Sequence, residues 1–395
     1  LELRFLTCAG LLIFLTESGP WRSVVQWGGL ADQYAYGGYL QPSEFGIAIL
    51  AACAFANCER RHLAVACLVV AAWFHASYLL ACGAVALGLA VERGLAGHPR
   101  QGIALLSAFG LCVLPMALYG LTFGGDPRSV ALSREILTEH LIPQHAWPRF
   151  WLSAMQCVKL GIMCAGTLAA FRLWHRSVAF AMTAALLMIA GGILFVYLTG
   201  NRFVALLFPW RASVFLYPLS LLALSAVGAD ILTTLAGAAL GSERTSQWLR
   251  LGTYAVALLL VAESARELTL SRYSASFSFP QTVARSARPD DVTIVPVTDA
   301  DIWNRFRLLS MRPIYVDRKS HPYGPAEVLE WKQRVDDVAA MYALPSDARP
   351  RRCSELGARF YVDSTTAWST DVDESTLRLV SCQIPPLPSA APGAP

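Results

Sequence analysis

The chain has 395 residues, of which 55% are hydrophobic and only 15% are charged, and its mean hydropathy is +0.45. An ordinary soluble protein is about 45–50% apolar and about 25% charged, so the composition argues against a purely soluble chain. The net charge of +4 comes without a basic cluster. This argues against nucleic-acid binding, because phosphates demand a concentrated Lys/Arg face.

Residues 1–265 hold nearly all of the long apolar runs, and we assign them to a membrane domain. A spanning helix needs about 20 apolar residues. Runs of this length occupy residues 102–123, 151–171, 178–198 and 212–232. Shorter apolar runs occupy residues 5–16, 45–57 and 251–262. The sequence begins at Leu1 without a cleavable leader, and we expect it to be an N-terminally truncated piece of a longer protein.

The run 63–91 is too long for one straight span and is interrupted by FHASY at residues 74–78. We interpret it as two short helices or one broken helix. A backbone break at membrane depth survives only where protein or a water-filled cavity covers it, so this part should border a cavity. The sequence therefore predicts an all-α polytopic membrane bundle of about nine helices, some short or broken. No internal repeat is evident.

The arginines orient the bundle, because short cytoplasmic loops carry an excess of Lys and Arg. Four alternate short loops each carry a pair: Arg60 and Arg61, Arg93 and Arg100, Arg172 and Arg176, Arg244 and Arg250. The loops 17–44 and 124–150 are longer but poorer in arginine, and we place them outside. With these loops assigned, the number of membrane crossings places the chain after residue 262 on the outer side. We expect a multi-pass protein of the plasma (inner) membrane with a periplasmic or extracellular C-terminal domain.

Residues 273–384 have the pattern of a small soluble α/β domain. Short β-branched runs at 291–297, 312–316, 359–362 and 376–380 are strand candidates. Residues 325–344 have helical spacing. Strand–helix–strand alternation favours an α/β layer. The Pro/Ala-rich residues 385–395 are expected to be disordered.

The ten cysteines form no CxxC pair, so their spacing suggests no zinc site. No cofactor is expected, and spacing does not indicate a divalent cation. Only Cys353 and Cys382 belong to the C-terminal domain. Because the topology exports them to a compartment where disulfides persist, we predict a bond between them over two independent thiols.

The first outer loop, 17–44, mixes tryptophans and tyrosines with Asp32 and Glu44. Aromatic rings beside carboxylates suit sugar recognition, because the rings stack on C–H faces and the carboxylates accept hydroxyl hydrogens. For the aromatics, an interfacial belt is the more economical interpretation. For Asp32 and Glu44, a catalytic role and a turn role are balanced.

The second outer loop contains EHLIPQHAWPR at residues 139–149, in which two histidines (His140 and His145), Glu139 and Arg149 lie beside a helix entrance. Such a group could hold a phosphate or act as acid and base. The alternative is an ordinary polar loop, but the density of titratable groups favours function here.

Three further polar residues lie at membrane depth or at its edge. His75 is either functional or a hydrogen-bonding partner of the broken backbone, and the second interpretation is slightly favoured. Lys159 lies about 12 Å inside its helix and either snorkels or faces a cavity where it could pair with a lipid phosphate. Arg211 is a candidate substrate ligand, although a snorkelling interface arginine is the plainer interpretation.

In the C-terminal domain, Asp317 and Lys319 follow the predicted strand at 312–316. Polar residues just after a strand end are where α/β layers build sites. A charged surface loop is the competing interpretation.

Three segments together resemble a known family. Residues 41–80 contain QPSEFGIAIL, an arginine pair and LAVACLVVAAWFHASYLL, the loop reads EILTEHLIPQHAWPRFW, and the tail reads FRLLSMRPIYVDRKSHPYGPAEVLEWKQRV. They resemble bacterial membrane glycosyltransferases of the GT-C type and exopolysaccharide polymerases, with Gln144 where the loop pattern has the first histidine of a pair.

The resemblance implies an acidic catalytic residue in the first outer loop, a role for Asp32 or Glu44. It implies transfer or polymerisation of a sugar from a polyprenyl-phosphate donor, with a carboxylate as base and Lys159, His145 or Arg149 stabilising the leaving phosphate. The expected partners are membrane lipid and the lipid-linked donor; protein partners are not indicated. The alternatives are a transporter or flippase, and a non-catalytic scaffold with a partner-binding domain.

Overall fold

The computed structural model describes residues 28–31, 33, 46–122, 124–240, 277–298, 300–318, 322–363 and 372–382. The chain forms two compact units. The membrane unit comprises Leu1–Thr122 and Thr138–Arg272, and the C-terminal unit comprises Phe123–Leu137 and Tyr273–Pro395. Residues 124–137, expected from the sequence to belong to an outer loop, therefore join the C-terminal unit.

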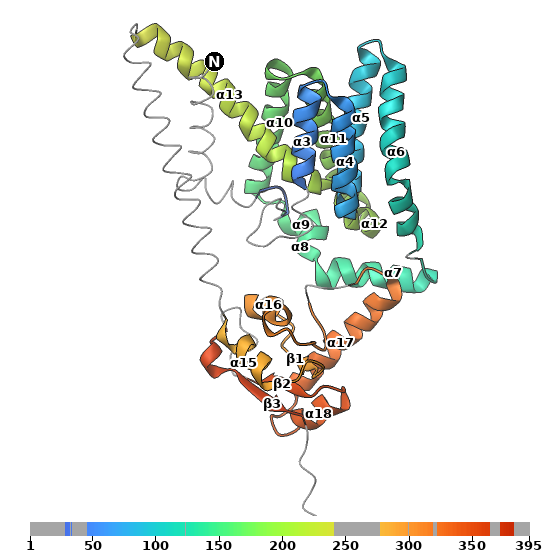
Figure 1. Cartoon of the computed structure of the whole chain (residues 1–395), viewed down its shortest axis with the longest axis vertical. Helices are drawn as coiled ribbons and strands as arrows, with labels where there is room; N and C mark the ends of the chain where they lie inside the picture. The colour runs from blue at the N-terminus through green and yellow to red at the C-terminus, as the bar shows by residue number, and fades with distance from the viewer. Residues whose placement is uncertain are drawn as a thin grey trace, which may run out of the picture. The chain divides into compact units, whose positions relative to one another are not determined.

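The membrane unit is a bundle of apolar helices (Figure 1). Within the described residues, five helical stretches are long and apolar enough to cross a membrane: Ala76–Leu95, Pro99–Gly120, Ala154–Leu173, Arg176–Thr199 and Arg202–Leu232. The individual helices are α3 (Ile47–Asn57), α4 (Arg61–Phe74), α5 (Leu79–Leu95), α6 (Pro99–Thr122), α10 (Ala154–Leu173), α11 (Arg176–Thr199) and α13 (Ser213–Leu240). The prediction of a bundle with several membrane-spanning helices is confirmed to the extent that these five stretches show it. The candidate spans 5–16 and 251–262 lie outside the described residues, so the count of about nine stays a prediction.

The predicted interruption of the run 63–91 is present. Helix α4 ends at Phe74, a 3₁₀ turn (η2) follows at Ala76–Tyr78, and α5 begins at Leu79. His75 has an extended backbone (φ −149°, ψ 106°), and its Nδ1 accepts a hydrogen bond from the backbone N–H of Ser77 at 3.3 Å. His75 therefore caps the restarted helix, as the slightly favoured interpretation of this residue expected.

Small residues allow the helices to approach closely. A Cβ at Gly88 of α5 would lie 2.5 Å from the carbonyl oxygen of Phe180 in α11, and one at Gly166 of α10 would collide with Ser220 of α13. Close backbone approach at small residues is a main source of packing between helices in lipid, where the hydrophobic effect does not drive association. A side chain at either glycine would separate a pair of helices.

The connecting segments meet at two opposite ends of the bundle. At one end, Glu59 lies 3.0 Å from His175, and Glu92 accepts a hydrogen bond from Ser177 at 3.0 Å. These residues belong to the loops predicted to be cytoplasmic. At the other end, Arg211 donates to Ser77. The loops assigned to one side by their arginines thus contact one another.

The C-terminal unit contains a three-stranded sheet in the order β1-β2-β3. Strand β1 (Thr293–Ile294) is parallel to β2 (Phe360–Asp363), and β2 is antiparallel to β3 (Arg378–Ser381). Helices α15 (Ser278–Ser286), α16 (Asp301–Ser310), α17 (Pro325–Ala343) and α18 (Arg349–Glu355) accompany the sheet. Its core contains Val295, Trp303, Phe306 and Val362.

Most of the predicted elements of this unit are observed, with one correction. The run 291–297 contains β1, the runs 359–362 and 376–380 overlap β2 and β3 up to their last residue, and 325–344 contains α17. The run 312–316 forms only a single bridge, between Ile314 and Thr293. Pro313 has no backbone N–H to donate to a ladder, which limits pairing here. Helices α15, α16 and α18 were not expected from the sequence.

A short helix of the loop after α6 belongs to the C-terminal unit. Helix α7 (Pro127–Glu135) packs against α17 (Figure 1). The Oδ1 of Asp126 caps it by accepting from the backbone N–H groups of Arg128 and Ser129, at 3.0 and 3.1 Å. A π-helix, Ile136–Leu141, follows directly. The boundary between the two units falls inside this π-helix.

The disulfide predicted between Cys353 and Cys382 is present, with a Cα–Cα distance of 5.4 Å. Cys353 lies in α18, shortly before β2, and Cys382 directly follows β3. Phe360 pairs with Ser381 in the antiparallel register, so the two cysteines meet at the same end of the strand pair. Both are fully buried.

Replacing Cys353 and Cys382 by serine should lower the free energy of unfolding of the C-terminal unit by about 3–4 kcal/mol. The bond closes a loop with a sequence separation of 29, and loss of such a constraint releases chain entropy in the unfolded state. Hydrogen exchange of β2 and β3 in the full chain should report faster opening. Cys58→Ser, at an exposed free thiol, is the control, and equal exchange in both variants would contradict the prediction.

Candidate functional site

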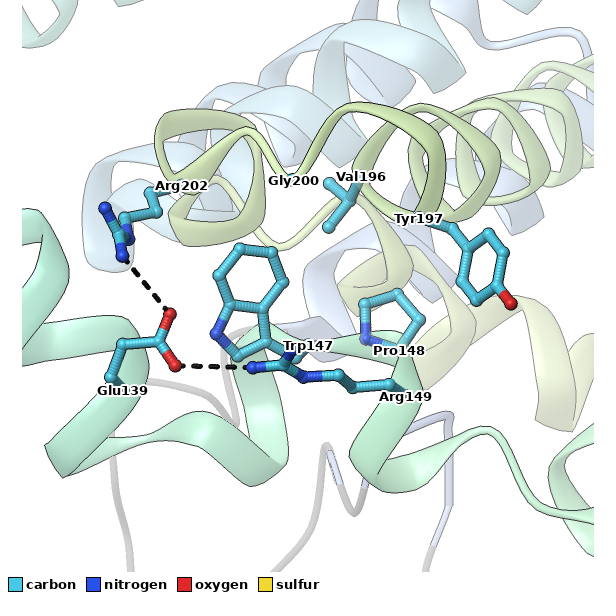
Figure 2. A pocket seen from close by; sticks show the side chains of 8 residues that line it. All are labelled: Glu139, Trp147, Pro148, Arg149, Val196, Tyr197, Gly200 and Arg202. Atoms are coloured by element: carbon cyan, nitrogen blue, oxygen red, sulfur yellow. Dashed lines mark hydrogen bonds and ion pairs between the residues drawn. The ribbon is translucent and has the colours of Figure 1, made fainter.

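A cavity of about 360 Å³ opens where α11 ends and the segment after the π-helix begins (Figure 2). It is lined by Glu139, Trp147, Pro148, Arg149, Val196, Tyr197, Gly200 and Arg202. These residues come from the π-helix, from α9 (Pro148–Trp151), from the end of α11 and from the start of α12 (Arg202–Leu206).

Local sequence accounts for the sharp turns that form this cavity. Pro143 begins α8 (Pro143–Ala146) and Pro148 begins α9, positions where proline costs no helix hydrogen bond. Gly200 ends α11 with φ +62°, a conformation that glycine adopts without strain. The side chain of Asn201 then caps α12 by accepting from the N–H of Val204. Rigid turns therefore place polar side chains around one opening.

One carboxylate lies between two guanidinium groups in this cavity. Glu139 Oε2 is 3.4 Å from Arg149, and its Oε1 is 3.6 Å from Arg202 (Figure 2). All three side chains are partly exposed, so these ion pairs are weak and open to exchange with a ligand. The Arg149 guanidinium also lies 5.3 Å from the ring centroid of Trp147.

Trp147 lines the cavity, and its indole Nε1 is buried without a hydrogen-bond partner in the part of the chain that the structure describes. A buried polar group usually has a partner. The two guanidinium groups alone form a donor set suited to an anion with several oxygen atoms.

A second polar layer holds the first loop against the bundle. Lys159 is only 2% exposed, and its Nζ donates to the carbonyl oxygens of Gly28 and Gly29 at 3.0 and 3.3 Å. The Nδ1 of His145 lies 2.7 Å from the carbonyl oxygen of Ala31. Ser213 accepts from the N–H of Leu30 at 2.7 Å. Lys159 is thus turned into the protein and does not snorkel toward the membrane surface.

The structure brings together two of the predicted site residues and leaves others undecided. His145 and Lys159 both bind residues 28–31, directly before Asp32. Asp32, Glu44 and Lys319 lie outside the described residues. Their predicted roles, and the predicted meeting of Glu44 with His145 and Lys159, stay predictions.

Arg211 binds the two polar residues of the helix break, Ser77 and His75. It donates to the hydroxyl of Ser77 and lies 3.4 Å from His75 Nε2. Its guanidinium is 5.6 Å from the ring centroid of Tyr78 and 5.9 Å from that of Phe208. These contacts show what Arg211 binds within the protein, and its two predicted roles, substrate ligand or snorkelling interface arginine, stay predictions.

Of the remaining predicted residues, Arg149 lines the cavity, while the exposed His140 does not. Sequence reasoning grouped Glu139 with Arg149 in the second outer loop but did not single out Arg202 or Tyr197. These two residues are distant from that loop in sequence, and only the packing of the end of α11 and the start of α12 brings them to the cavity. Asp317 lines a separate cavity in the C-terminal unit. Among the described residues, no group of three His, Cys, Asp or Glu could hold a metal ion.

Comparison with known proteins gives one similarity. Residues 281–338, in the C-terminal unit, match a family described as a domain of unknown function, DUF6798. No curated protein matches the chain significantly.

Replacing Lys159 by methionine should destabilise the membrane unit by about 1–3 kcal/mol, because the carbonyls of Gly28 and Gly29 would lose a buried donor. A lower melting temperature of the protein in detergent would show this. Thr183→Ala is the control, because among the described residues its hydroxyl bonds the carbonyl of Ala179 in its own helix and nothing else. An unchanged melting temperature for Lys159→Met would contradict the anchoring role.

Proposed function

We propose that this protein is an integral membrane glycosyltransferase that transfers or polymerises sugars from a polyprenyl-phosphate-linked donor at the outer face of the membrane. The observation that supports the proposal is the cavity in which Arg149 and Arg202 flank Glu139 beside the buried indole N–H of Trp147. The family resemblance of the loop 135–151 agrees with it.

The donor phosphate takes the place that the Glu139 carboxylate occupies between the two guanidinium groups. Arginine binds phosphate through paired, charge-assisted hydrogen bonds. As the bond from the anomeric carbon to the phosphate oxygen breaks, that oxygen leaves with the electron pair. Arg149 and Arg202 stabilise the charge that develops on it.

Displaced from its arginines, Glu139 becomes the general base. Its carboxylate accepts the proton of the acceptor hydroxyl as that oxygen bonds to the anomeric carbon. Trp147 and Tyr197 provide aromatic surface for the sugar ring at the cavity wall. Asp32, beside the segment that Lys159 and His145 hold, is the alternative base that the resemblance implies.

Two observations support placing the C-terminal unit outside. Helix α7 of the loop 124–150 packs against α17, so that loop and the C-terminal unit belong on one side of the membrane. The bond between Cys353 and Cys382 suits an oxidising compartment. Both agree with the orientation that the paired arginines favour.

Alkaline phosphatase fused after Ser274 should be active in a bacterial host, because this enzyme needs export to fold. The same reporter fused after Glu59, in a predicted cytoplasmic loop, should be inactive. A fluorescent protein that folds only in the cytoplasm should give the opposite pattern. Fluorescence after Ser274 together with phosphatase activity after Glu59 would overturn the orientation.

Arg149→Ala and Arg202→Ala should each lower the rate of sugar transfer by about 10²–10³, the usual effect of removing one donor to a developing oxyanion. The assay uses the full chain in nanodiscs with radiolabelled polyprenyl-phosphate-linked sugars and oligosaccharide acceptors. Arg128→Ala, at an exposed position of α7, is the matched control. Transfer that survives both cavity substitutions would refute the role of this cavity.

One observation favours the alternative, a transporter or flippase. Two His-x-Ser sequences, His75–Ser77 and His175–Ser177, begin α5 and α11, and in each the histidine Nδ1 accepts from the serine N–H, at 3.3 and 3.2 Å. The two helices are antiparallel, because Glu92, near the end of α5, accepts from Ser177 at the start of α11.

Buried positions recur along both helices at the same distance from the histidine. They are Ala81, Cys82, Val85 and Leu89 in α5 and Ala181, Met182, Ala185 and Ile189 in α11. The two helices thus share a His-x-Ser cap and a spacing of buried positions, although no internal repeat was expected from the sequence. Many transporters are built from inverted repeats.

Proteoliposomes containing a fluorescent polyprenyl phosphate distinguish the two functions. A glycosyltransferase should move the lipid between leaflets no faster than protein-free vesicles while it transfers sugar. Rapid movement without transfer would favour the flippase.

A further inference from the structure

The C-terminal unit contains a second cavity, of about 260 Å³, between α16, the chain after Ile314, and α17. All of its lining residues lie within residues 307–334, inside the segment that matches the DUF6798 family. This cavity belongs to neither the membrane unit nor its candidate site.

Hydrogen bonds fix one wall of this cavity. The indole Nε1 of Trp331 donates to the carbonyl oxygen of Asp317 at 2.8 Å. Arg334 donates to the carbonyl oxygen of Tyr315 at 3.3 Å, and its guanidinium lies 5.6 Å from the centroid of the Tyr315 ring. Arg334 is also paired with Glu330 at 2.5 Å. Helix α17 and the chain after Ile314 are thereby joined around a preformed hollow.

Two further charged residues of the lining, Arg307 and Glu327, differ from Arg334 and Glu330 in their contacts. Among the described residues, the side chains of Arg307 and Glu327 make no hydrogen bond or ion pair, yet both residues line the cavity. The Arg307 guanidinium offers several hydrogen-bond donors, and the Glu327 carboxylate offers several acceptors. Burial raises the pKa of Tyr315, and Asp337 adds to the rise, so the Tyr315 hydroxyl keeps its proton across the neutral range.

The balance of charges narrows the class of ligand. The lining has three carboxylates, Asp317, Glu327 and Glu330, against two guanidinium groups. A phosphate or nucleotide would meet net repulsion in such a site. A ligand rich in hydroxyl groups meets donors and acceptors together, and Tyr315 and Trp331 add aromatic surface to the lining.

We propose that this cavity is a saccharide-binding subsite that holds one end of the acceptor glycan. Its volume lies below the ~300–1,000 Å³ of most small-molecule sites, which suits a terminal sugar ring of a longer chain. The assignment of an acceptor rests on the proposed glycosyl transfer, because that activity supplies a glycan to hold.

The test uses the full chain in nanodiscs on an array of bacterial capsule and lipopolysaccharide oligosaccharides, followed by Kd measurement for each bound probe. The wild type should bind a subset of the array. Arg307→Ala and Glu327→Gln should each weaken binding about tenfold or more, through loss of charge-assisted hydrogen bonds. Lys332→Ala and Asp336→Asn are matched controls, because these residues pair with each other on α17 and do not line the cavity.

Binding that is lost in the cavity variants and kept in the controls supports the proposal, provided that all variants melt at the wild-type temperature. The proposal is overturned if no oligosaccharide on the array binds the protein. It is also overturned if the control variants lose binding to the same extent, or if inorganic phosphate displaces the bound oligosaccharide. Binding without any transfer activity would leave a saccharide site and refute the proposed enzyme. Transfer with an unchanged acceptor KM in Arg307→Ala would refute the subsite alone.

Discussion

Backbone groups that leave a helix at membrane depth must find partners inside the protein, because lipid offers none. At one end of this bundle the chain leaves regular helix in several places, and side chains supply the missing partners. Lys159 serves the carbonyls of Gly28 and Gly29, and Ser213 serves the N–H of Leu30. Trp210 donates to the carbonyl of His145 at 2.9 Å. The irregular segments are thereby fixed to helices α10 and α13, and the cavity with Glu139 is built on that fixed base.

The π-helix Ile136–Leu141 connects this base to the C-terminal unit. It carries Glu139 in the middle and continues α7, which packs on α17. Helix α17 also lines the second cavity, through Glu327 and Trp331. A π-turn inserts an extra residue into a helix and is frequent at functional sites. Here the carboxylate between the two arginines lies on the segment that directly continues α7, the helix that packs on α17.

Local features were predictable from the sequence and tertiary partners were not. The FHASY interruption predicted the break after Phe74, because polar residues are costly inside an apolar run unless they bind irregular backbone or a ligand. The disulfide followed from having two cysteines in a domain that the arginine pattern predicts to be exported. The partners of Arg211 could not be foreseen, because Ser77 is distant in sequence and reaches it only through the packing of the helices. The Glu139–Arg202 pair is equally non-local. Short helices such as α16 were not predicted, because ten residues are too few to show a clear helical repeat of apolar positions.

The two His-x-Ser caps bind side chains of opposite charge, and the helix dipole favours one of these charges and disfavours the other. A helix N-terminus carries partial positive charge and favours an anion. Glu92, bound to Ser177 at the start of α11, meets that preference. Arg211, bound to Ser77 at the start of α5, opposes it. Its position is maintained instead by the rings of Tyr78 and Phe208. At one end of the bundle, the motif therefore binds an acidic side chain, which the partial positive charge of the helix N-terminus favours. At the other end it binds a cation, which that charge disfavours. This second end is where His145, Lys159 and the candidate site lie.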